Sequence, residues 1–325
     1  MGRYIRKRLL LLIPTIILVC VIVFLLLRML PGSAVDALTY KIQSSGTYNV
    51  NRADVEAMLG MNRPAVVQFF VWFWHAIQGD LGTCFFQSET VLAAIGRQLP
   101  PSLELGILTL ILTNVLSIPL GLYCAARQDT ISDYSIRVLS LILMSLPMFW
   151  LATLMLIYPA IWWNYSPPAQ YVSFFVNPLQ NLSMFIIPAF LGAIAQTGMQ
   201  LRTVRTVLLD TMRLDYVRTA WAKGAGERSI MFRHAFRNSM IPVVTIIGGS
   251  VGMLIGGSVI LETIFNIPGI GRQVITAIGS RDFPLVQGCV LVFSLFTMLI
   301  NLIVDISYKW IDPRVSLDKE RREGK

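Results

Sequence analysis

Long apolar runs separated by short polar segments dominate this chain of 325 residues. Six runs have close to twenty residues or more, the length that crosses about 30 Å of hydrocarbon as an α-helix. They predict transmembrane helices over residues 9–30, 103–126, 138–163, 182–200, 241–264 and 284–306. The fourth is the shortest, and it begins among polar residues. The predicted fold class is therefore all-α, a polytopic membrane protein with six transmembrane helices.

The composition agrees with this prediction, because 55% of the residues are hydrophobic and only 14% are charged. Soluble domains carry about 25% charged residues. The N-terminal sequence MGRYIRKR precedes a first apolar run that is longer than the roughly 7–15 residues of a signal-peptide core. We therefore expect a retained first span behind a basic tail.

The distribution of basic residues predicts the orientation in the membrane. Of the 27 Lys and Arg residues, 20 lie in the N-terminal tail, the second-to-third loop, the fourth-to-fifth loop and the C-terminal tail. Because cytoplasmic loops collect Lys and Arg, both termini are expected in the cytoplasm. The net charge of +9 then follows from topology, and nucleic-acid binding loses its main support.

This topology predicts four regions along the chain. Residues 1–30 form the cytoplasmic tail and first span, and residues 31–98 form an outer loop. Residues 99–307 form a five-helix core with a cytoplasmic loop at 201–240, and residues 308–325 form a cytoplasmic tail. The outer loop is too long for a plain connector. It contains the aromatic stretch FFVWFWHAIQGDLG, residues 69–82, which fits either an interfacial aromatic belt or a docking surface for an external partner.

No catalytic or metal-binding set is apparent in the sequence. The four cysteines lie far apart, and the only histidines are His75 and His234. A zinc site with about four close ligands is therefore not expected, nor is a disulfide framework. A phosphate-binding G-x-x-x-x-G-K-[ST] loop is also lacking, so no cofactor is expected on this chain.

Polar residues inside the predicted spans are few, namely Glu104, Asn114, Glu262, Asn301 and Asp305. Intramembrane carboxylates are costly and are functional candidates by default. All three carboxylates fall near the ends of spans, which favours structural capping. A proton relay would require carboxylates near the middle of the membrane, so a proton-driven carrier is disfavoured.

Three glycines in the fifth predicted span recur every fourth residue, at Gly248, Gly252 and Gly256. This spacing places them on one helical face, where another helix can approach closely. Packing within the protomer and a role along a pathway or subunit interface both remain open. Phe149, Met253 and Ser258 are further candidates for the lining of a pathway.

The fourth-to-fifth loop departs from the apolar pattern, with the sequence DYVRTAWAKGAGERSIMFRHAFRNSMIPVV at residues 215–244. Leu214, Val217 and Trp221 predict a short helix with one apolar face. Gly224 and Gly226 break that helix, and Phe232, Phe236 and Met240 predict a second helix from about Arg228. The segment could rest on anionic lipid, bind an acidic ligand or insert into a groove on a cytoplasmic partner.

The same loop resembles the cytoplasmic signature of permease subunits of ATP-binding-cassette importers, in the dipeptide, oligopeptide and nickel branch. The resemblance extends over nearly the whole chain. It includes GDLG (79–82), LPPSLELG (99–106), SLPMFWLA (145–152), ETIFNIPGIGR (262–272), RDFPLVQG (281–288) and NLIVDISYKWIDPR (301–314). It implies the type I importer permease fold and a location in the bacterial inner membrane.

The resemblance implies that this loop couples the permease to an ATPase subunit. The residues concerned are Asp215, Tyr216, Arg218, Thr219, Ala220, Trp221, Ala222, Lys223, Gly224 and Arg233. Trp221 stands where many relatives have Arg. The implied partners are a second permease subunit, two ATPase subunits that hold ATP and Mg²⁺, an extracytoplasmic binding protein and membrane lipid.

Two other classes of function remain as alternatives. A secondary transporter driven by an ion gradient would require charges near the middle of the membrane or an inverted repeat, and neither is visible. A membrane-embedded enzyme would require convergent groups, whereas His75 and His234 are predicted on opposite sides of the membrane. Within the importer class, a dipeptide, an oligopeptide, a nickel complex or glutathione could be the substrate.

Overall fold

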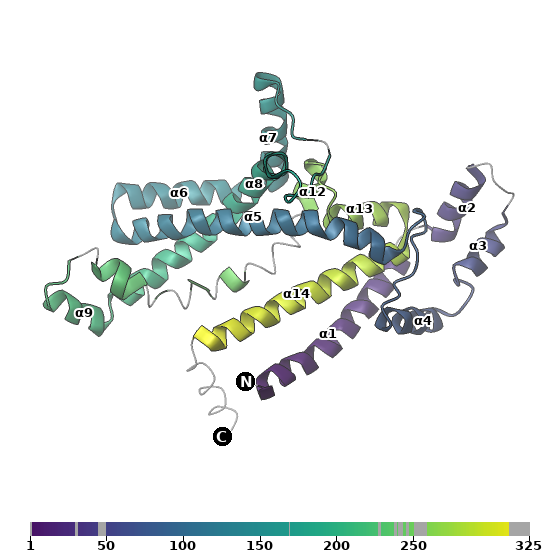
Figure 1. Cartoon of the computed structure of the whole chain (residues 1–325), viewed down its shortest axis with the longest axis horizontal. Coiled ribbons are helices and arrows are strands. Elements are labelled where there is room, and N and C mark those ends of the chain that lie inside the picture. The colour runs from purple at the N-terminus through teal and green to yellow at the C-terminus, as the bar shows by residue number, and fades with distance from the viewer. Residues whose placement is uncertain are drawn as a thin grey trace. The chain divides into compact units, whose positions relative to one another are not determined.

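In the part of the chain that the computed structural model describes, the regular secondary structure is helical, apart from one isolated bridge between Thr83 and Thr90 (Figure 1). It describes residues 2–29, 32–44, 50–168, 170–226, 229–236, 239, 243–244, 247–249 and 259–311. The all-α prediction is confirmed for these residues. The chain divides into two compact units, residues 1–102 with 268–298 and residues 103–267 with 299–325.

The first unit is built around the first long helix and the two ends of the outer loop. It contains α1 (Gly2–Met29), α2 (Ala34–Ser44), α3 (Arg52–Met58), α4 (Ala65–Ile77) and α13 (Ile270–Ser280), with the first parts of α5 (Val91–Ala126) and α14 (Phe283–Ile311). One buried cluster joins Cys20 of α1, Val91 and Ile95 of α5, Ala277 of α13 and Cys289 of α14. Segments that are distant in the sequence therefore share one apolar core.

Asp282 anchors the loop between α4 and α5. Its carboxylate is buried and accepts hydrogen bonds from the backbone N–H groups of Phe85 (2.9 Å) and Phe86 (3.2 Å). It also accepts from the N–H of Leu285 (3.3 Å), in the first turn of α14. A single side chain thus joins the outer loop to the α13–α14 turn.

The second unit contains the remainder of α5, α6 (Ile131–Ser145), α7 (Met148–Trp163), α8 (Pro178–Met212), α9 (Asp215–Ala222), the π-helix η1 (Ile230–Phe236) and α12 (Val259–Ile264), with the last part of α14. Its core includes Leu105 of α5, Ala152 of α7, Phe185 of α8 and Leu261 of α12. Helix α8 contacts both α6 and α7.

Four described helices are long and apolar enough to cross a membrane, with the apolar stretches Leu10–Met29, Val91–Ala126, Pro178–Met212 and Phe283–Val304. They correspond to the first, second, fourth and sixth predicted spans. The fourth prediction was too short, since α8 extends beyond it at both ends. Much of the fifth prediction, including residues 250–258, lies outside the described residues, and α12 covers its end. The number of six spans, the orientation of the termini and the four predicted regions stay predictions.

The third predicted span, residues 138–163, was wrong as a single helix. The structure has two helices there, α6 and α7, which are bent by 92° relative to each other. The reason lies at Leu146 and Pro147. A residue before proline is disfavoured in the helical region, and Leu146 accordingly adopts an extended conformation (φ −77°, ψ 133°). The pair is a broken span or a re-entrant segment.

The three hydrogen bonds to Asp282 lead to a prediction about the outer loop. Replacing Asp282 with Ala leaves three backbone donors without their acceptor, and a buried donor without a partner costs about 1–3 kcal/mol. We expect chymotrypsin to cleave at Phe85 and Phe86 several times faster in Asp282→Ala than in the unmodified protein. Asp80→Ala is the matched control, because Asp80 is exposed and caps only Gly82 in the same loop. Equal cleavage rates in all three proteins would contradict the anchoring role.

Candidate functional site

Helix α9 follows α8 after a sharp change of direction. The last turn of α8 closes with hydrogen bonds from the N–H groups of Arg213 and Leu214 to the carbonyls of Asp210 and Thr211 (both 3.2 Å). Leu214 is then extended (φ −72°, ψ 148°), and α9 begins at Asp215. Figure 1 shows α9 beyond the C-terminal end of α8. The short helix is therefore presented at one extremity of the second unit.

One buried side chain holds α9 in place. Val217 is completely buried, and α9 contacts α8 and η1. The predicted apolar face was correct for Val217 only, because Leu214 and Trp221 are 50% and 47% exposed. Leu214 precedes the helix as its N-cap in an extended conformation, and Trp221 lies in the last turn of α9. The two apolar residues that remain exposed are available to a partner.

The structure brings the predicted coupling residues together on this exposed helix and the turn after it. Ala220 is half-buried, and the exposed members are Asp215, Tyr216, Arg218, Thr219, Trp221, Ala222, Lys223 and Gly224. Asp215 and Arg218 form a long ion pair of 3.8 Å on the surface. The side chain of Arg233 lies outside the described residues.

The end of α9 is a Schellman motif that requires Gly224. The N–H of Ala225 donates to the carbonyl of Ala220 (3.2 Å), and the N–H of Gly224 donates to that of Trp221 (2.9 Å). Gly224 has φ +79°, a left-handed conformation that glycine adopts without steric cost. A Cβ at this position would meet nothing within 4 Å, so the requirement comes from the backbone and not from packing. The break predicted at Gly224 is confirmed, and the structure shows that its turn is left-handed.

The second predicted helix exists, but its geometry differs from the prediction. It is the π-helix η1, in which Ile230 and Ala235 are buried and Phe232 is 57% exposed. The prediction that Phe232 and Phe236 share one face assumed an α-helical period. In a π-helix the hydrogen bonds connect i and i+5, and the buried residues Ile230 and Met231 lie five and four positions before the buried Ala235. Arg228, Arg237 and Met240 lie outside the described residues.

A small apolar cluster joins α5, α8 and η1 near α9. It contains Leu122 and Ala125 at the end of α5, Leu208 of α8 and Ala235 of η1. Partly buried side chains pack around it, including Met212 and Phe236. We call these residues the platform. It joins the end of one long helix to the two elements that contact α9.

A buried ion pair fastens the same part of α8 to α6. Arg205 donates from Nε to Oδ1 of Asp133 (3.0 Å) and from Nη2 to Oδ2 (2.8 Å), a bidentate arrangement. Asp133 is completely buried, and its Oδ1 lies 3.1 Å from Nε of Arg137. The N–H of Asp129 donates to Oδ2 as well (3.2 Å). Sequence reasoning missed Asp133, although it is an acidic residue between two arginines of a predicted basic loop.

Comparison with known proteins identifies the family of this chain. The model of the family described as "Binding-protein-dependent transport system inner membrane component" matches residues 117–317. This stretch includes α6 to α9, the platform and the ion pair. The chain belongs to this family.

Several relatives of the permease align along almost their whole length. A putative peptide transport system permease protein of Brucella suis biovar 1 is 38% identical over 98% of this chain and 100% of its own. A probable peptide transporter permease of Sinorhizobium fredii is 33% identical, over 97% and 99%. The dipeptide transport system permease protein of Escherichia coli K12 is 32% identical, also over 97% and 99%. The resemblance to importer permeases of the peptide branch is thereby confirmed, and the permease is a multi-pass membrane protein.

The polar residues inside the spans of the permease bind one another. Glu104 of α5 accepts hydrogen bonds from Tyr171 Oη (2.9 Å) and from Asn181 Nδ2 of α8 (2.7 Å). Burial, followed by the adjoining Glu104 carboxylate, raises the pKa of Tyr171 to about 12, so its hydroxyl remains the donor. Further along the same helices, Gln200 Nε2 donates to Asn114 Oδ1 (2.7 Å). For Glu104 the structure agrees with a structural role.

The remaining candidates of the permease are placed only in part. Gly248 is buried, while Gly252, Gly256, Met253 and Ser258 lie outside the described residues. Phe149 is 58% exposed at the start of α7. Glu262 is buried in α12, and Asn301 is exposed. Within the described ranges, no three His, Cys, Asp or Glu residues gather as a metal site. The pathway stays a prediction.

The Asp133–Arg205 pair leads to a prediction about stability. Asp133→Ala leaves the guanidinium of Arg205, whose side chain is only 14% exposed, without its partner. Breaking a buried pair costs roughly 3–5 kcal/mol, which is the upper limit here. We expect a lower free energy of unfolding in an SDS titration of the purified permease. The control is Asp36→Ala, which removes an exposed pair with Arg52 and should change stability by about 1 kcal/mol or less.

The double variant Asp133→Leu with Arg205→Met should recover part of the lost stability, since it leaves no guanidinium at position 205 without a partner. Arg137 also loses its contact with Asp133, but its side chain is 27% exposed and can be solvated. A single variant as stable as the unmodified permease would show that the pair does not hold α6 to α8.

Proposed function

We propose that the chain is a permease subunit of an ATP-binding-cassette importer for peptides. It pairs with a second permease subunit around a common path, and an extracytoplasmic binding protein delivers the peptide. Two ATPase subunits hold ATP and Mg²⁺ and drive transport from the cytoplasmic side. The observation that carries the proposal is α9, an exposed helix that rests on one buried valine and is connected to the long helices through the platform and the ion pair.

The proposed substrate class rests on the relatives that align over the whole chain. Those from Brucella suis and Sinorhizobium fredii are named for peptide transport, and that from Escherichia coli is named for dipeptide transport. A peptide of a few residues is therefore the first substrate to test. Selectivity within that class would reside mainly in the binding protein.

We propose that α9 seats in a cleft of the ATPase subunit. Ala220 and Ala222 have small side chains, which permit a close approach of the helix backbone. Leu214 and Trp221 offer exposed apolar surface for the contact. A conformational change of the permease requires contacts that differ between its two states. Closure of the ATPases supplies this difference by displacing α9.

The platform supports a route by which that displacement reaches the membrane helices. A movement of α9 acts on α8 and η1, which it contacts. The platform connects α8 and η1 to the end of α5, and the Asp133–Arg205 pair connects α8 to α6. Packed elements of this kind shift between discrete arrangements instead of deforming gradually. The loop thus acts as a lever on α5, α6 and α8.

A co-purification experiment tests the partners. The permease is expressed with the neighbouring transporter subunits and purified in a mild detergent. We expect an ATPase subunit to co-purify with it. Replacing Ala222 with Arg should reduce the recovered ATPase several-fold, because a long charged side chain prevents close seating of α9. Recovery of permease without any ATPase, or full recovery with Ala222→Arg, would contradict the docking proposal.

Replacing Gly224 tests the lever itself. In Gly224→Val a β-branched residue must adopt the left-handed conformation, at a cost of about 1–3 kcal/mol. A loss of that size predicts a fall of roughly 5- to 150-fold in peptide uptake and in peptide-stimulated ATP hydrolysis. Membrane expression should be unchanged, because position 224 is open and exposed.

Two control variants separate backbone strain from side-chain volume. Gly226→Val introduces the same side chain two residues away, at an equally open position without a positive φ, and should retain uptake. Gly224→Asn should retain part of the uptake, since Asn tolerates the left-handed region. Normal uptake in Gly224→Val would refute the role of this turn.

A further inference from the structure

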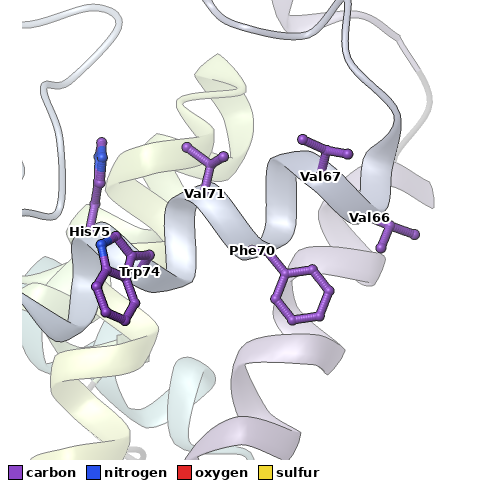
Figure 2. A pocket seen from close by; sticks show the side chains of 6 residues that line it. All are labelled: Val66, Val67, Phe70, Val71, Trp74 and His75. Carbon is purple, nitrogen blue, oxygen red and sulfur yellow. The ribbon is translucent and has the colours of Figure 1, made fainter.

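Helix α4 has an apolar face that the protein leaves uncovered. Val66, Val67, Phe70, Val71 and Trp74 are between 41% and 66% exposed, and Ile77 is 62% exposed. With His75, the first five line a shallow hollow (Figure 2). Figure 2 shows Phe70 and Trp74 pointing to one side of the helix and Val67, Val71 and His75 to the other. Contiguous apolar surface of this kind marks an interaction site.

The opposite face of α4 is already occupied by protein. Phe69 packs edge-on against Phe24 of α1, with ring centroids 5.2 Å apart. Arg28 of α1 donates to the side-chain oxygen of Gln68. Phe69, Trp72, Phe73 and Ala76 pack against the core of the first unit. The helix is therefore fixed to α1 on one side and apolar on the other.

The length of α4 excludes a transmembrane course. Thirteen residues extend about 20 Å, whereas the hydrocarbon layer is about 30 Å thick. Exposed charged residues lie just beyond its two ends, Arg63 before the helix and Asp80 after it. A helix of this length with polar ends can lie within one interface of the membrane.

We propose that α4 is embedded in the outer leaflet of the membrane, with Phe70 and Trp74 in contact with lipid acyl chains. The outer loop is thereby held by lipid as well as by protein. The inference rests on the membrane location of the family and on the predicted outer position of this loop, and not on the proposed substrate or ATPase partners.

Continuity with α1 identifies lipid as the occupant. Helix α1 is a candidate span, and it also exposes apolar side chains such as Leu18, Ile22 and Leu25. Because α4 packs directly on α1 near Phe24, the two uncovered surfaces belong to adjoining elements. A lipid layer around α1 would extend to α4 without any further protein.

The chemistry of the uncovered face disfavours a water-soluble partner. The sequence of α4 contains no Lys, Arg, Asp or Glu. Protein interfaces carry about one hydrogen bond per 100–200 Å² and a polar rim, and reversible docking depends on them. Among the side chains labelled in Figure 2, only the indole of Trp74 and the imidazole of His75 contain polar atoms. Trp is enriched where apolar and aqueous layers meet, which fits the edge of a bilayer.

The test uses single reporter cysteines in the assembled transporter, reconstituted in vesicles of phosphatidylethanolamine and phosphatidylglycerol. All four native cysteines are buried, and burial raises the pKa of Cys84 to about 11, so the native thiols react slowly. Phe70→Cys and Trp74→Cys are labelled with a nitroxide. Its collisions with oxygen, which partitions into lipid, and with a water-soluble nickel chelate are then measured.

Two matched positions calibrate the measurement. Leu18→Cys lies on the exposed face of α1 and reports lipid, while Met58→Cys is 79% exposed on α3 and reports water. We expect the oxygen-to-nickel collision ratio of Phe70→Cys and Trp74→Cys to match Leu18→Cys and to exceed Met58→Cys several-fold. The ratio should be unchanged when the extracytoplasmic binding protein is added.

Two results would overturn the proposal. A ratio equal to that of Met58→Cys would place α4 in water. If the ratio is low without the binding protein, and the nickel chelate loses access to the label only when that protein is added, the face belongs to the binding protein. Peptide uptake by the labelled variants is measured in parallel, so that a lost substrate activity is distinguished from a misplaced helix.

Discussion

The hydrocarbon layer of a membrane offers no water to the backbone, so each N–H and C=O group inside it must find a partner within the protein. This constraint explains why α1, α5, α8 and α14 are long helices, and why α1 and α8 continue through Pro14 and Pro188. Helices end or bend where the local sequence favours another backbone conformation. At Leu146 and Pro147 the chain turns by 92°, and at Gly224 a Schellman motif satisfies the last carbonyls of α9.

The same constraint governs the polar side chains, which the structure joins in pairs between helices. Glu104 and Asn114 of α5 bind Asn181 and Gln200 of α8, and Asp133 of α6 binds Arg205 of α8. Helix α8 is a member of every pair. Because buried polar groups without partners are costly, these contacts restrict how α8 can move relative to α5 and α6. A force on α9 therefore acts on a connected group of helices.

The outer loop is held by a different set of contacts. Asp282 fixes its final segment through backbone hydrogen bonds, and α4 packs its inner face on α1. Asp282 is a single polar anchor, whereas α4 makes an apolar contact with α1 and leaves its other face uncovered. These two contacts add to the loop's own small apolar cluster, in which Val35, Leu38 and Val55 are buried.

The sequence by itself determined the helical class, four of the spans, the end of the helix at Gly224 and the family, because these depend on hydrophobic run length, backbone sterics and local motifs. It did not determine the break at Pro147 within an otherwise apolar run, since proline is tolerated in other helices of the same chain. Only the tertiary structure decided that Val217 alone anchors α9 and that η1 is a π-helix, because burial depends on neighbouring elements. It also decided the partners of Asp133 and Asp282, whose acceptor oxygens bind groups more than 70 residues away.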